Sequence, residues 1–308
     1  MEANVADRKI YIHTNSKQLI GALVARHTLQ RNSRKPERFD VEIITAESFP
    51  ALTRREGLPY LREGEPAIWR NDDLQSFAPL RFAVPELMGY AGRAVVIDPG
   101  VFALGDINEL LDADMDGAAV LARRIEPDAR RPLHFASSVM LLDCARLRHW
   151  QLERDFDRLF TRQVDYCDWM WLLLEPPGIV GTLAPGWNAF DRLTPATKLL
   201  HNNHRRTQPW KTGLPVDYTK RGKTLQKKVS AVLRGLAASV TGISGMKGLY
   251  RAHPDPAQEQ FFFRMLGECL ERGIITERQL RTEIQQRHIR ADALERIRAV
   301  RGVTLACA

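Results

Sequence analysis

Asp98 is the residue of this chain best placed to do chemistry, because it directly follows the apolar segment Val95–Ile97. Three uncharged residues of β-branched type predict a strand in the middle of a sheet, and Pro99 and Gly100 end it. Ligands of open α/β sheets bind beyond the carboxyl ends of the strands. A carboxylate at this point is therefore a candidate binding group.

A basic residue, Arg81, precedes this strand in a segment that is predicted to be helical around Pro85. A guanidinium binds two phosphate oxygens at once through its planar fork. Arg81 is therefore a candidate phosphate ligand. The alternative is an ordinary surface residue of a helix.

Small polar residues follow the first predicted strand, Lys9–His13, and they are Thr14, Asn15 and Ser16. A strand that ends this way exposes backbone groups that can hydrogen-bond the edge of a bound ring. An ordinary strand-to-helix turn is the alternative. Ser137 and Ser138 are similar small polar residues within another strand-like segment, His134–Asp143.

Two further groups of polar residues stand out later in the chain. Asp165 and Asp168 form the first group, for which a solvated helix start is one interpretation. His201, Arg205, Arg206, Gln208 and Trp210 form the second group, and Trp187-Asn188 precedes them. His201 alone would be read as a buried structural histidine, but its aromatic and polar neighbours favour a functional role.

In this order, the segments resemble glycosyltransferase family 8 and its relatives over roughly residues 8 to 212. The resemblance implies a GT-A fold and transfer of a hexose, with retention, from a nucleotide diphosphate sugar to an acceptor hydroxyl. Uridine is the nucleotide it favours. The catalytic residues that it implies are Asp98, Asp168 and Arg81. The nucleotide- and sugar-binding residues that it implies are Thr14, Asn15, Ser16, Arg81, Ser137, Ser138, Asp165, Asp168, Arg205, Arg206, Gln208 and Trp210.

A divalent cofactor follows from the resemblance, with Asp98 and His201 as ligands of Mn²⁺ or Mg²⁺. The sequence departs from the family at this point, because Gly100 stands where the second aspartate of Asp-x-Asp would be. We therefore expect cationic side chains to do part of the work of the metal. Gly100, Ala136 and Gln208 also leave open an alternative, a non-catalytic GT-A scaffold that binds a nucleotide sugar or a partner without turnover.

Strands that alternate with helices over the first 200 residues predict an α/β fold with a mostly parallel twisted sheet flanked by helices. We place the nucleotide-sugar-binding domain at residues 1–215. Residues 216–308 are predicted to form a basic amphipathic helix and a helical C-terminal extension.

The positive charge of the chain is concentrated in one segment. Lys198–Arg251 holds twelve Lys or Arg residues and one acid, whereas the whole chain has a net charge of +8. Within it, residues 220–251 either dock an apolar stripe on the catalytic domain or lie on an anionic membrane surface. We expect no nucleic-acid partner, because no recognition motif accompanies the charge.

Composition predicts a cytoplasmic protein, with peripheral attachment at the inner face of the membrane as a further option. The four cysteines show no metal-ligand spacing, which is typical of a reducing compartment. We identify neither a secretory signal peptide nor a membrane-spanning segment. The acceptor is expected to be a glycan or a lipid-linked glycan.

Overall fold

The computed structural model describes residues 8–129, 131–218 and 248–300. Its centre is a six-stranded sheet in the order β2-β1-β5-β8-β7-β9. The strands are β1 (Arg8–Thr14), β2 (Asp40–Thr45), β5 (Arg93–Ile97), β7 (Val120–Ile125), β8 (His134–Asp143) and β9 (Val180–Thr182).

Five of the six strands run in the same direction. β1 is parallel to β2 and β5, and β7 is parallel to β9, whereas β8 is antiparallel to both of its neighbours. The expectation of a mostly parallel sheet flanked by helices is confirmed.

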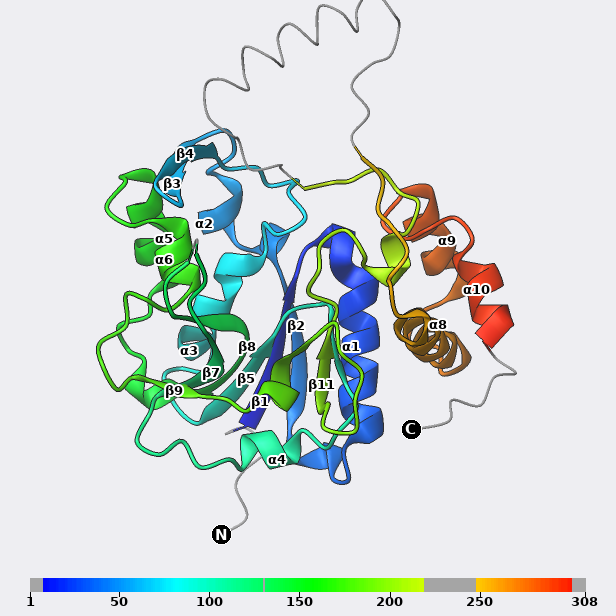
Figure 1. The fold of residues 1–308 in the computed structure, drawn as a ribbon, viewed down its shortest axis with the longest axis horizontal. Coiled ribbons are helices and arrows are strands. Elements are labelled where there is room, and N and C mark those ends of the chain that lie inside the picture. The colour runs from blue at the N-terminus through cyan, green and yellow to red at the C-terminus, as the bar shows by residue number, and fades with distance from the viewer. Residues whose placement is uncertain (1–7, 130, 219–247, 301–308) are drawn as a thin grey trace, which may run out of the picture.

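Both faces of the sheet are buried, since alternate residues of each strand enter different hydrophobic clusters. Ile10 and Ile12 pack on one side of β1 and Tyr11 packs on the other. The first side is covered by α1 (Leu19–Asn32) and, beyond it, α8 (Pro256–Glu271). The second side is covered by α3 (Val84–Leu87), α5 (Leu152–Phe160) and α6 (Tyr166–Met170), as Figure 1 shows.

One segment without a regular sequence pattern contains defined elements, and another differs from its expected form. The region around residues 49–75, which lacks a regular sequence pattern, contains α2 (Pro50–Thr53) and a hairpin of β3 (Pro59–Arg62) and β4 (Glu65–Ile68). The single helix expected near Pro85 is instead a 3₁₀ helix, Ala78–Phe82, followed by the short α3. Prolines near the start of both elements explain the division, because proline is tolerated in the first turn of a helix and not in its interior.

A second, three-stranded sheet lies beside the carboxyl end of β5. It has the order β10-β11-β6, with β10 (Ala189–Phe190), β11 (Leu199–His201) and β6 (Val101–Ala103). The short α4 (Asn108–Leu111) follows β6. Because β6 begins three residues after Asp98, this sheet brings the chain around residue 201 close to the end of β5.

The C-terminal helices are α8, α9 (Glu277–Gln285) and α10 (Ala293–Val300), which confirms the predicted helical extension. Phe262 of α8 stacks on Trp210, so these helices share the hydrophobic cluster of the sheet. The domain boundary at residue 215 stays a prediction. Most of the basic segment 220–251 lies outside the described residues, and within those residues no helix has the length and apolarity to cross a membrane.

Candidate functional site

The site begins where β1 and β5 end side by side. Ile12 pairs with Ile97 in the parallel register, so the next residues, His13 and Asp98, are neighbours. His13 Nε2 lies 2.7 Å from a carboxylate oxygen of Asp98, and the imidazole is fully buried. The sequence places a polar residue at the end of β1 but does not give the register that brings it to Asp98.

Arg81 joins these two residues to a third strand. Its guanidinium donates to the same oxygen of Asp98 at 2.8 Å and to Oγ of Ser137 on β8. The Arg81 side chain is 8% exposed, whereas that of Asp98 is 16% exposed and lines a cleft. Arg81 thus lies at the strand end, where its first partner is a carboxylate of the protein. Its role as a phosphate ligand stays a prediction.

The charges of this cluster are fixed at neutral pH. Burial alone would raise the pKa of Asp98, but Arg81 and the hydrogen bond from His13 lower this pKa to about 2. Burial lowers the pKa of His13 below its usual value, even though Asp98 favours the protonated form. The cluster therefore consists of a carboxylate, a guanidinium and a neutral imidazole.

A hydrogen-bonded chain connects His201 to the same strand end. His201 Nδ1 lies 3.0 Å from Oδ1 of Asn188, and Nδ2 of Asn188 donates to Oγ of Ser138 at 3.0 Å. In this arrangement Nδ1 of His201 carries the proton and Nε2 carries the lone pair. Burial also lowers the pKa of His201, so its imidazole is neutral.

The side chains here do not fit a divalent ion in the manner that the resemblance implies. Over the described ranges, no group of three or more His, Cys, Asp or Glu side chains is arranged to hold a metal. Asp98 already accepts from Arg81 and His13, whereas Mg²⁺ and Mn²⁺ need several oxygen ligands. The ligand roles of Asp98 and His201 stay predictions.

The place of the second aspartate lies against an aromatic ring. A Cβ atom on Gly100 would lie 3.4 Å from the indole of Trp210 and 3.7 Å from the backbone oxygen of Asn202. Trp210 is buried and stacks on Phe262. A longer side chain at position 100 would therefore point toward the packed core.

The cleft beside Asp98 has a volume of about 480 Å³. It contains five of the predicted site residues, namely Arg81, Asp98, Ser137, Ser138 and Arg205. It also contains residues that the sequence analysis did not select, among them Arg62, Arg123, Arg131, His134, Tyr166, Trp171 and Phe190. Five arginines and one carboxylate line it, which suits a ligand with negative charge.

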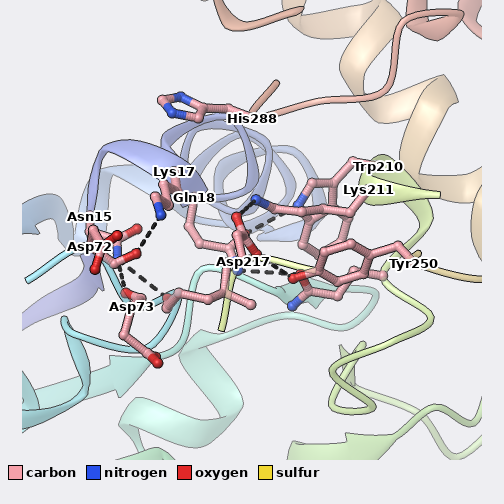
Figure 2. A network of polar contacts seen from close by, with 12 residues as sticks. Asn15, Lys17, Gln18, Asp72, Asp73, Trp210, Lys211, Asp217, Tyr250 and His288 are labelled. Atoms are coloured by element: carbon pink, nitrogen blue, oxygen red, sulfur yellow. Dashed lines mark hydrogen bonds and ion pairs between the residues drawn. The ribbon is translucent and has the colours of Figure 1, made fainter. Parts of the chain in front are cut away.

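Other predicted binding residues lie in a separate polar network, drawn in Figure 2. Asn15 donates to the backbone oxygens of Asp73 and Leu74, and its side chain therefore fixes a loop. Gln18 accepts from the Trp210 indole at 3.1 Å and donates to Gln208 at 3.3 Å. These bonds fix the start of α1.

Three other predicted nucleotide-binding residues, Thr14, Ser16 and Arg206, also lie outside the lining of the cleft. Thr14 is buried, and Ser16 donates its backbone N–H to Glu47 at 2.9 Å. Arg206 lies beside Gly248. The nucleotide-binding roles of these residues stay predictions.

Helical phase separates Asp165 and Asp168 from the cleft. Tyr166, Cys167 and Met170 of α6 line it, whereas the two aspartates do not. Asp165 caps α6 through the N–H of Cys167 and also accepts from the N–H groups of Glu63 and Gly64 at 3.0 and 2.8 Å. Burial, with a smaller contribution from Asp165, raises the pKa of Asp168.

Similar folds occur among solved glycosyltransferase structures, whereas no protein-family model and no curated protein matches the chain. Mouse xyloside xylosyltransferase 1 is 16% identical with a TM-score of 0.41, and the match covers 64% of this chain and 97% of that one. The glycosyltransferase GlyE of Streptococcus pneumoniae is 13% identical with a TM-score of 0.47, over 88% of this chain and 64% of that one. The galactosyltransferase LgtC, solved with donor and acceptor sugar analogues, is 12% identical with a TM-score of 0.42, over 77% of this chain and 98% of that one.

Proposed function

We propose that this protein is a glycosyltransferase that binds a nucleoside diphosphate sugar, with uridine as the nucleotide, in the cleft beside Asp98. The observation that carries the proposal is the Arg81–Asp98–His13 cluster at the carboxyl ends of two parallel strands, inside a cleft rich in arginine. Ligands of open α/β sheets bind at such strand ends. Arginine is the residue best suited to a diphosphate, because it binds two oxygens at once.

In the proposed reaction the bond between the anomeric carbon of a hexose and the diphosphate oxygen breaks. The nucleoside diphosphate leaves with the electron pair, the acceptor hydroxyl oxygen bonds to the anomeric carbon, and its proton passes to a departing phosphate oxygen. With attack from the side of the leaving group, the configuration is retained. Fixed cations stabilise the charge that develops on the diphosphate without reorganisation.

Arg81 and Arg205, which both line the cleft, are the proposed ligands of the diphosphate. In this proposal Asp98 holds Arg81 in place, and Ser137 and Ser138 face the donor sugar.

A second candidate function is binding of a nucleotide sugar without turnover. Gly100 favours it, because the chain lacks a second carboxylate at this position, which lies against the indole of Trp210. Turnover distinguishes the two functions, since both predict the same affinity for the donor.

A thermal-shift screen of UDP-, GDP- and CDP-sugars, with EDTA or with Mn²⁺, tests the proposal. We expect stabilisation by one UDP-sugar and none with the Arg81→Gln variant. Slow release of UDP from the stabilising donor then supports the transferase, and its absence supports the binding protein. A chain that no nucleotide sugar stabilises under either condition would contradict both functions.

A further inference from the structure

The cleft continues well beyond the end of β5. The backbone N–H of Asp98 donates to the oxygen of Ser138, which fixes the middle of β8 beside Asp98. His134 lines the same cleft four residues further along β8. At a rise of about 3.3 Å per residue, this places His134 about 13 Å from the Asp98 end. A ligand that fills the cleft therefore extends past the diphosphate.

Aromatic side chains line the rest of the cleft, the distal half, which we define by Arg123, Ile125, His134, Trp171 and Phe190. It begins at Phe190, whose ring centroid lies 5.5 Å from that of His201, and extends to His134. The rings of His134 and Trp171 lie with centroids 4.7 Å apart, and Phe190 lies below the guanidinium of Arg123. Rigid aromatic faces of this kind are well suited to pack against a sugar ring.

Arg123 lies at an irregularity of the sheet and shares its face of β7 with Ile125, which also lines the cleft. The register between β7 and β8 shifts between Ala122 and Arg123, and such shifts redirect side chains. The guanidinium lies 4.2 Å from the ring centroid of Phe190 and donates to the backbone oxygen of Asn188 at 2.6 Å. Arg124, the next residue, is exposed and pairs with Glu126 outside the cleft.

The charge of Arg123 has no counterpart in the described parts of the protein. No described Asp or Glu forms an ion pair with it, and burial followed by the nearby Arg192 lowers its pKa. The Arg123 side chain is half-buried and contacts a ring and a backbone oxygen, so its charge is available to an anionic ligand in the cleft. Arg131, by comparison, is already paired with Asp128.

We propose that the distal half of the cleft is a subsite for a sugar that carries a phosphate or a carboxylate, and that Arg123 binds this anion. The inference rests on the proposed function and adds the chemical class of one substrate. The anion belongs either to the acceptor glycan or to the transferred sugar. Titrations with free sugars test the first source, and titrations with UDP-sugars test the second.

Calorimetric titrations of the full chain test the proposal, with glucose 6-phosphate, glucuronate and glucose as probes, each with and without saturating UDP. We expect an anionic sugar to bind more tightly than glucose. Arg123→Gln should weaken that binding by about tenfold or more, the loss of a charge-assisted hydrogen bond, and leave UDP affinity unchanged. Arg123→Lys should keep part of the affinity, and Arg124→Gln should change nothing.

A second titration compares UDP-glucuronic acid with UDP-glucose. A preference here that Arg123→Gln removes assigns the anion to the transferred sugar, whereas a preference among the free sugars assigns it to the acceptor. Equal affinity for neutral and anionic sugars in both arms would overturn the subsite while leaving the proposed function intact. Loss of UDP binding in a folded Arg123→Gln variant would also overturn it, by placing the residue on the donor diphosphate. A wild-type chain that binds no nucleotide would instead count against the proposed function.

Discussion

Asp98 is a carboxylate whose charge is balanced inside the protein. Its side chain accepts from Arg81 and His13. This arrangement differs from a carboxylate held ready for a metal, because the partner charge is a fixed guanidinium. Asp98 thus serves to hold Arg81 at the edge of the cleft.

The depressed pKa of Asp98 predicts how acid affects the protein. A folded-state pKa of about 2 lies below the usual 3.8, so the native state binds this proton less readily than the unfolded chain. The pair therefore contributes about 2 kcal/mol above pH 4, and this contribution disappears as the pH falls toward 2. Urea titrations of wild type and Asp98→Asn should give stabilities that converge over this range. A constant difference would contradict the ion pair.

Arg81 is expected to contribute both to the unfolding free energy of the protein and to the binding of the UDP-sugar. Arg81→Gln leaves the Asp98 carboxylate buried without a cation, which should cost about 3–5 kcal/mol of unfolding free energy. The double variant Arg81→Gln/Asp98→Asn should recover most of that stability and still fail to bind the UDP-sugar. Recovery of binding in the double variant would show that Arg81 does not contact the phosphate.

Asp98 and Arg81 could be selected as candidate site residues from the sequence, because one directly follows the predicted central strand and the other precedes it. His13 could not, since its contact depends on the register between strands that lie far apart in the sequence. Trp210 illustrates a second limit. The sequence pattern suggests a ligand contact, but the indole packs in the core against Phe102 and Phe262.

At the scale of elements, phase and register decide which polar residues reach the cleft. α6 presents Tyr166, Cys167 and Met170 to the cleft, and its capping residue Asp165 instead holds the β3–β4 turn. The capping residue Asp165 indicates from sequence where this helix starts. Which face of the helix is buried depends on the strands that pack against it, and the sequence does not give that packing.

The contact between α1 and the turn after β5 gives a prediction at this scale. A Cβ atom on Gly21 would lie 2.6 Å from the backbone oxygen of Pro99. Gly21→Ala should therefore displace the Asp98 turn and destabilise the fold by about 1–3 kcal/mol. Thermal unfolding measures this effect, with the exposed Gln30→Ala on the same helix as the control. Equal melting temperatures for the two variants would show that the close contact is absent.

At the scale of the whole molecule, the mostly parallel sheet and the C-terminal helices could be predicted from alternation and periodicity. The reversed strand β8 could not, because an apolar run such as Val139–Leu142 carries no direction. The packing of α8 on α1 and Trp210 likewise depends on long-range contacts.

A buried ion pair and a hydrogen bond join the described segments that precede and follow residues 219–247. Lys211 is fully buried and donates to Asp217 at 2.8 Å, and Tyr250 donates to the same carboxylate. Burial lowers the pKa of Lys211 despite this partner. Figure 2 shows the three side chains together.

Asp217→Asn should destabilise the protein by about 3–5 kcal/mol, because it leaves the Lys211 ammonium buried without a carboxylate. Tyr250→Phe, which removes one hydrogen bond and keeps the ion pair, should cost about 1 kcal/mol. Denaturant titrations of the two variants measure the difference. Losses of equal size would show that the ion pair does not dominate this contact.

In the proposed function, fixed cations, rather than a metal held by Asp98, bind the donor diphosphate. The most direct measurement is calorimetric titration of UDP into wild type and Asp98→Asn, in EDTA and in Mn²⁺. We predict that wild type binds UDP in EDTA, that Mn²⁺ does not tighten this binding, and that Asp98→Asn weakens it without abolishing it, because Arg81 loses the carboxylate that positions it. Binding that requires Mn²⁺ and is abolished by Asp98→Asn would contradict the claim.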